Sequence, residues 1–175
     1  MAVATAEQVQ NLHDTVLQRL KDRFGESIFS SSIEYDFPCF QVKREKAFEI
    51  LQFLKEDQNL NFHFLTTLCG LHYPDQVGHE MGVMYQLHNM PQNTRIRIKT
   101  FFPEKDAHTH SVTALWPTAN WMERQEYDFF GIRFNGHPDL RRILNMDDFH
   151  GYPMRKEFPL EDPTRDDKND SMFGR

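Results

Sequence analysis

The chain has 175 residues, a formal net charge of −6 at pH 7 and two cysteines, Cys39 and Cys69. A chain of this length buries roughly two-thirds of the surface that its unfolded form exposes, so we expect one domain with a substantial core and an extension. The acidic balance argues against a broad nucleic-acid-binding surface, and two cysteines are too few for a zinc or iron–sulfur site.

The predicted elements begin with a helix over residues 5–24. Thr5 and Gln8 form a capping box, and apolar residues then recur at helical spacing. The next stretch, residues 27–43, alternates in the manner of two short strands with a break at Pro38.

A second helix is predicted over residues 44–58, where apolar residues fall on one helical face. The period then changes to two, which predicts half-buried strands over 60–68, 80–88 and 94–100. The apolar residues expected to share one side within each strand are Leu60, Phe62, Phe64 and Leu68, then Met81, Val83, Tyr85 and Leu87, then Ile96 and Ile98.

The order helix, two strands, helix, three strands is typical of a two-layer α+β domain with helices on one face of a mostly antiparallel sheet. In the last strand Arg95, Arg97 and Lys99 point away from the apolar side. A basic strand face of this kind is usually only solvated, and a partner site is the alternative.

After the sheet, Thr118 can cap a helix that runs to about Phe130 and stops at Gly131. Aromatic and charged residues alternate around this helix without a clean apolar stripe. We therefore expect it to be covered on more than one side, with Arg124 and Asp128 paired at i,i+4.

The remaining residues, 131–175, show little periodicity, and Pro138, Pro153 and Pro159 interrupt them. The apolar content up to Leu160 argues against a disordered tail. We therefore predict an α+β domain over 1–130 and an extended C-terminal partner-binding segment over 131–175, the alternative being that the segment folds back on its own sheet. The expected anchors are Leu140, Phe149, Tyr152, Met154 and Phe158.

An enzyme is the alternative class of protein. The segment offers carboxylate and imidazole groups that could bind a metal, namely His137, Asp139, Asp147, Asp148 and His150. Zinc spacings such as HExxH are absent from the sequence, as are GxSxG, the P-loop and GxGxxG. We therefore favour capping, turn and interface roles for these residues.

The run ANWMERQEYDFFGIRFNGHPDLRRIL, followed by GYPMRKEFPL, closely resembles the signature of the 30 kDa-type (C-type) subunit family of bacterial NADH:quinone oxidoreductase, respiratory complex I. The mitochondrial relative is the 30 kDa subunit. One position departs from the family pattern, because Gln125 stands where a Glu-Arg-Glu triplet usually ends. The matching residues are Glu123, Arg124, Asp128, Phe129, Phe130, Gly131, Ile132, Gly136, His137, Pro138, Arg141 and Arg142.

The resemblance implies a non-catalytic subunit in the peripheral arm of the complex, packed beside the large subunit that helps to form the quinone site. It implies that FMN and iron–sulfur clusters are held by partner subunits and none by this chain. The complex would pass electrons from NADH to quinone and translocate ions, at the cytoplasmic face of the bacterial inner membrane. The equivalent subunit of a membrane-bound hydrogenase or a ferredoxin-dependent complex is the nearest alternative.

The N-terminal residues MAVATAEQVQ lack the basic start and apolar run of a signal peptide, and no stretch approaches the roughly 18 consecutive apolar residues of a membrane span. We therefore expect a peripheral protein without a span of its own. The residues expected to contact partners are Glu123, Arg124, Asp128, His137, Arg141, Arg142, Tyr152, Arg155, Lys156 and Phe158.

Overall fold

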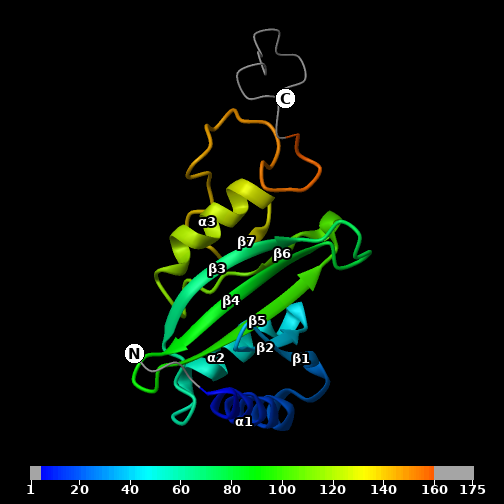
Figure 1. Ribbon diagram of the computed structural model, residues 1–175. Helices are drawn as coiled ribbons and strands as arrows, with labels where there is room; N and C mark the ends of the chain where they lie inside the picture. Colours follow the sequence, from blue (N-terminus) through cyan, green and yellow to red (C-terminus); the bar gives the residue numbers. More distant parts are fainter. Residues whose placement is uncertain (1–4, 160–175) are drawn as a thin grey trace, which may run out of the picture.

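The computed structural model describes residues 5–159, which fold into a five-stranded sheet, a two-stranded sheet and three α-helices (Figure 1). The helices are α1 (Ala6–Phe24), α2 (Ala47–Glu56) and α3 (Ala119–Phe130). The strands are β1 (Ile28–Glu34), β2 (Phe37–Val42), β3 (Phe64–His72), β4 (Met81–Asn89), β5 (Thr94–Phe102), β6 (His108–His110) and β7 (Arg133–Asn135).

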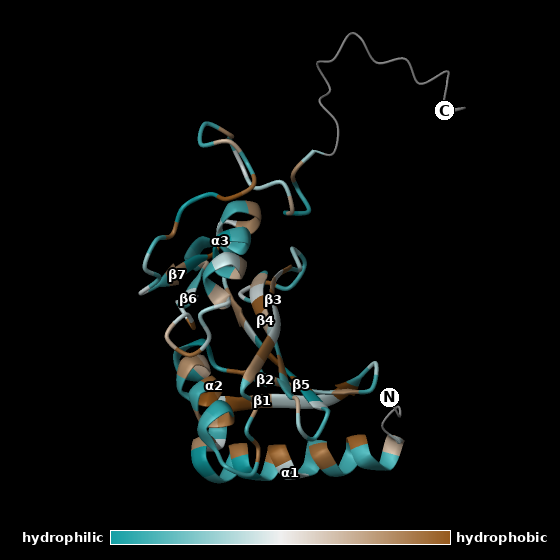
Figure 2. Cartoon of the chain, turned by 90° about the vertical axis from the view of Figure 1, so that its left-hand side faces the viewer, coloured by the Kyte–Doolittle hydropathy of each residue, from teal (hydrophilic) through white to brown (hydrophobic). Residues whose placement is uncertain are grey.

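Helix α1 begins at the capping box that the sequence predicts. The backbone N–H of Gln8 donates to the Thr5 hydroxyl at 3.3 Å, and the N–H of Thr5 donates to the Gln8 side chain at 2.9 Å. Its apolar side faces the sheet in Figure 2, where His13 stacks on Phe40 of β2 with ring centroids 5.4 Å apart. The helix is therefore held at its start by hydrogen bonds and along its length by burial.

The five strands are ordered β1-β2-β5-β4-β3. The β2–β5 pair is parallel and the other pairs are antiparallel, which confirms the predicted α+β fold with its mostly antiparallel sheet. The alternation expected in β4 and β5 is also confirmed, since Val83, Tyr85, Leu87, Ile96 and Ile98 are fully buried.

The predicted break between the first two strands is displaced. Tyr35 and Asp36, with φ of 51° and 65°, make the turn, whereas Pro38 lies inside β2 opposite Ile33. Pairing with β5 begins only at Cys39, so the missing N–H of the proline removes no hydrogen bond from that ladder.

The expected side for Phe64 is wrong. A register shift between Leu65 and Thr67 places an extra residue in β3, so Leu65 and Leu68 are buried while Phe64 is exposed. A strict period of two cannot reveal such a bulge, because every residue that precedes the bulge changes face.

All three helices lie on the same face of the five-stranded sheet. Phe40, under α1, is paired with Ile98, which belongs to the same face as Val83. Gly70 is paired with Val83, and a Cβ on Gly70 would meet the Phe130 ring of α3 at 2.6 Å. Figure 2 shows α2, α3 and the small sheet on one side of β3 and β4. The core therefore lies between this face and the helices.

The parallel pair β6–β7 has no counterpart among the elements predicted from the sequence. His108, Thr109 and His110 pair with Arg133, Phe134 and Asn135. Both strands are only three residues long, too short for a periodic pattern to indicate. Through β7, the residues that follow α3 remain attached to the domain, and Ile132 and Phe134 are buried in its core.

Candidate docking surface

Helix α3 carries four ionisable side chains that are almost completely buried. Glu123, Arg124, Glu126 and Asp128 are exposed by 0%, 7%, 2% and 0%. Charged side chains are rarely buried to this degree without partners. The helix is thus covered on several sides, as the mixed pattern of its sequence indicates.

The two ends of α3 differ in how they are capped. Thr118 is the N-cap residue, but its side chain makes no capping hydrogen bond. Gly131 ends the helix in the left-handed conformation, with φ of 75° and its N–H donating to the Tyr127 carbonyl. The helix end predicted at Gly131 is confirmed.

Asp128 holds the first part of the C-terminal segment. Its carboxylate accepts a hydrogen bond from Arg142 at 2.8 Å and from the backbone N–H groups of Ile143, Leu144 and Asn145 at 2.9–3.1 Å. Burial alone would raise the pKa of Asp128, but these bonds, with one from the Asn145 amide, hold that pKa well below its usual range. The predicted Arg124–Asp128 pair is wrong, because Arg142 is the partner.

Arg124 holds the same segment from its other side. Its guanidinium donates to the backbone carbonyls of Arg141 and Arg142 at 3.2 and 3.0 Å and lies over the Trp121 ring, 5.1 Å from its centroid. The planar donor set of arginine suits two carbonyls in succession. Arg124 and Asp128 therefore fix residues 141–145 against α3.

Further along the segment, Arg155 and Tyr152 contact the end of α3. Arg155 donates to the Phe130 carbonyl at 2.8 Å and to the Glu104 carboxylate at 2.6 Å, and it lies 4.6 Å from the Tyr152 ring centroid. The Tyr152 ring rests on Gly131, where a Cβ would lie 2.5 Å from it. Glycine is therefore required at this position for both the helix end and the aromatic contact.

The last described residues contact both β3 and each other. The backbone N–H of Lys156 donates to Nδ1 of His72 at 3.0 Å. The Phe158 ring lies 5.9 Å from the Phe149 ring and against Gly151, whose φ is 98°. The segment therefore forms a loop that closes on itself and on the sheet edge.

Two buried carboxylates on α3 are held in a different way. Glu123 accepts the N–H of Val112 at 2.6 Å, and Glu126 accepts the N–H of Gly70 at 2.7 Å. Burial raises the pKa of each carboxyl to about 7, against the opposing effect of these hydrogen bonds. Neither forms an ion pair with a described residue, so both favour the neutral form.

His137, Asp139 and Arg141 lie nearer to solvent. His137 contacts the Asn120 carbonyl through Nε2 and accepts the N–H of Asp139 at Nδ1, while Arg141 pairs with the Asp139 carboxylate. Within residues 5–159, no three His, Cys, Asp or Glu side chains lie close enough to hold a metal ion. His137 thus has a turn-stabilising role in this structure.

The residues left exposed on α3 and the attached segment include large apolar side chains. We define the docking surface as Trp121, Leu144, Met146 and Met154, whose exposed fractions are 62%, 62%, 71% and 53%. Sequence reasoning named only Met154 among them. Trp121 was hidden by the mixed pattern of α3, and Leu144 and Met146 lie where no periodicity shows which side chains face outward. Exposed apolar groups gathered on one anchored segment are typical of a protein–protein contact.

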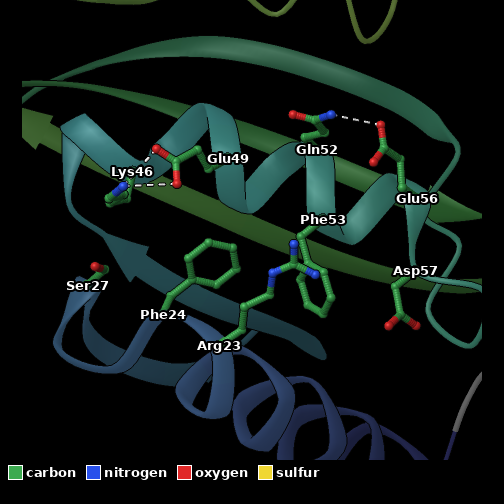
Figure 3. Close-up of a pocket in the computed structure, with 9 residues that line it drawn as sticks. All are labelled: Arg23, Phe24, Ser27, Lys46, Glu49, Gln52, Phe53, Glu56 and Asp57. Atoms are coloured by element: carbon green, nitrogen blue, oxygen red, sulfur yellow. Dashed lines mark hydrogen bonds and ion pairs between the residues drawn. The ribbon is translucent and has the colours of Figure 1, made fainter.

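A cleft of about 530 Å³ lies away from this surface, between α1 and α2 (Figure 3). Figure 3 shows Arg23 over the Phe53 ring, at 4.7 Å, and Lys46 paired with Glu49 at 2.7 Å. Asp57, at the edge, pairs with Arg19 at 2.8 Å. These groups satisfy one another across the cleft, so we assign it no ligand.

Comparison with known proteins identifies the family. Residues 40–164 match the family described as the 30 kDa subunit of respiratory-chain NADH dehydrogenase. Proteins named as the C-type subunit of NADH-quinone oxidoreductase are similar to this chain. The one from Mycolicibacterium gilvum is 40% identical over 84% of this chain and 67% of its own length, and the one from Geobacter sulfurreducens is 38% identical over 85% and 90%.

Two solved structures share the fold. A trypsin-resistant fragment of Nqo5 is 31% identical, with a TM-score of 0.61 over 71% of this chain and 99% of the fragment. A chain of an archaeal membrane-bound sulfane sulfur reductase has a TM-score of 0.70 over 84% of this chain and 85% of its own, but only 24% identity. From the family match, the NADH-quinone oxidoreductase relatives and the shared fold, the chain belongs to the family of the 30 kDa subunit of respiratory-chain NADH dehydrogenase.

Proposed function

We propose that this chain is a scaffold of the peripheral arm of NADH:quinone oxidoreductase, placed beside the large subunit that forms the quinone site. The complex transfers electrons from NADH through FMN and iron–sulfur centres to quinone. Those cofactors belong to partner subunits in this proposal, and the chain contributes binding surface and no catalytic group.

The observation that carries the proposal is the docking surface. Trp121, Leu144, Met146 and Met154 are exposed, although the backbone that bears them is fixed to α3 by buried charges. Tethering the segment in advance lowers the entropy lost when a partner binds. A large aromatic side chain surrounded by apolar neighbours is a common centre of binding energy.

The partner contacts expected from the sequence fall into two groups in this proposal. Arg141, Lys156 and Phe158 belong to the part of the segment nearest to solvent and would touch the partner. The others would act indirectly, by holding the segment in its docking conformation. They are Glu123, Arg124, Asp128, His137, Arg142, Tyr152 and Arg155.

We place the complex at the cytoplasmic face of the bacterial inner membrane, with this chain attached through its partners. Within the part of the chain that the structure describes, no helix has the length and apolar character needed to cross a membrane. The names of the curated relatives support the NADH-linked complex over a hydrogenase or a ferredoxin-dependent one. The likeness to the sulfane sulfur reductase supports only the fold.

The proposal is tested by an affinity pull-down of the tagged chain from its native membranes in mild detergent. We expect mass spectrometry to find FMN-bearing and cluster-bearing subunits in the eluate, together with NADH-dependent quinone reduction. Membranes with the untagged chain are the control. Recovery of the chain alone, with stoichiometric metal and no quinone reduction, would contradict the scaffold role and favour a metal enzyme.

A further inference from the structure

The five-stranded sheet has one face that no helix covers within residues 5–159. Strand β5 shows the contrast, since Ile96 and Ile98 are fully buried against the helices while Arg95 and Lys99 point the other way. Because α1, α2 and α3 all pack on the buried side, the basic residues lie on an open face. We define the open face as Gln41, Met84, Gln86, Arg95, Arg97, Lys99 and Phe101.

The positive charges on the open face exceed the negative ones. Lys99 pairs with Glu34 at 2.5 Å. Arg97 donates to the Gln86 amide oxygen at 3.2 Å, and neither Arg95 nor Arg97 has a carboxylate within 4.0 Å among residues 5–159. Two arginines thus lack carboxylate partners on a chain with 26 acidic and 20 basic residues.

The arginines elsewhere in the molecule behave differently. Arg19, Arg44 and Arg142 each pair with an aspartate at 2.8 Å. The chain therefore supplies carboxylates to arginines with structural roles. Unpaired guanidinium groups on a central strand remain available for a carboxylate from outside.

Aromatic and thioether groups surround these charges. The Arg97 guanidinium lies 4.4 Å from the Phe37 ring centroid, which restricts its motion before a partner binds. Met84 is half-buried beside it, and the Tyr73 and Phe101 rings lie 6.0 Å apart at the edge of the face. A hollow of about 340 Å³ opens there, lined in part by Tyr73, Lys99 and Phe101. Arginine, methionine and aromatic residues are the types enriched at protein interfaces.

We propose that the open face is a second docking surface, which binds a carboxylate-rich surface of another protein subunit through Arg95 and Arg97. Charge complementarity determines the sign of the partner. Nucleic acid is disfavoured because the chain carries a net charge of −6, which would repel an extended phosphate backbone. The inference rests on the proposed scaffold function, and it adds a second neighbour on a different face.

The first test reverses the charges in the intact complex. Cells would express tagged Arg95→Glu/Arg97→Glu in place of the normal chain, with Lys21→Glu/Lys105→Glu as the control. The control residues are exposed and lie off the open face, and the change in charge is the same. We expect about a tenfold or greater fall in the fraction of chain recovered in the complex, and no fall for the control.

The second test keeps the charge, so that it remains informative if the reversed variant does not fold. Arg95→Lys places an amine on the open face, which a zero-length carbodiimide reagent joins to a carboxylate in direct contact. We expect a new cross-link to an aspartate or glutamate of another subunit. Wild-type membranes define the background from Lys99.

The outcomes separate the two proposals. If the tagged wild-type chain recovers no complex, the scaffold function fails, and the second docking surface fails with it. If the complex is recovered, normal assembly of the charge-reversed variant without the new cross-link overturns only the open-face inference. Cross-links confined to this chain or to a second copy of it would also overturn it.

Discussion

Replacing Asp128 with asparagine should release the C-terminal segment from α3. The carboxylate accepts hydrogen bonds from three consecutive backbone N–H groups and pairs with Arg142, and its side chain is fully buried. Asparagine has the same size, but it presents an amide NH₂ to some of these donors and leaves Arg142 without its counter-charge. Breaking a buried pair in this way costs about 3–5 kcal/mol.

The loss should be local before it is global. Hydrogen exchange measured by mass spectrometry should accelerate over residues 141–158 while β4 and β5 remain protected, and recovery of the chain in the complex should fall by at least about tenfold. Asp139→Asn is the matched control, because its exposed pair with Arg141 contributes little. Unchanged exchange over 141–158 would show that Asp128 does not hold the segment.

The second large effect is a loss of stability as the pH rises through neutrality. The pKa values of Glu123 and Glu126 are raised from 4.5 to about 7 in the folded chain. In the unfolded chain both groups lose their protons near pH 4.5, while the folded chain retains them up to about pH 7. The folded state therefore binds more protons between these values, and its stability falls as pH rises through this window.

The expected size is about 3 kcal/mol for each carboxyl as an order of magnitude, since one pKa unit corresponds to about 1.4 kcal/mol. Thermal unfolding of the purified chain should show Tm falling between about pH 5 and about pH 7.5. In Glu123→Gln/Glu126→Gln the fall should be much smaller, because a neutral amide replaces the neutral acid and still accepts the N–H groups of Val112 and Gly70.

Glu49→Gln serves as the control for this measurement. Glu49 is half exposed and pairs with Lys46 on the surface of α2, so its removal should leave the pH dependence as in the wild type. An equally steep fall of Tm in the double variant would show that other groups cause it.

Local patterns predicted those parts of the fold whose information is local. The alternation in β4 and β5, the capping box at Thr5 and the helix end at Gly131 each depend on residues within a few positions of one another. The family signature likewise lies in one continuous run. Such features are legible because period and capping chemistry act over one or two turns.

Contacts between distant residues were not predictable in the same way. Pairing Arg124 with Asp128 is the natural choice at helical spacing, yet Arg142, fourteen residues from Asp128, takes that place. The short β6–β7 pair and the bulge in β3 also depend on tertiary packing. Which apolar side chains of the C-terminal segment face outward depends on these same contacts.

The docking surface is tested most directly by methionine oxidation in the free chain and in the intact complex. Met154 and Met90 are each 53% exposed, but only Met154 lies on the docking surface, while Met90 lies in the turn between β4 and β5. Both should oxidise readily in the free chain. In the complex, Met154 and Met146 should be protected at least about tenfold relative to Met90, because a buried interface excludes the oxidant. Equal oxidation of Met154 and Met90 in an active complex would contradict docking through this surface.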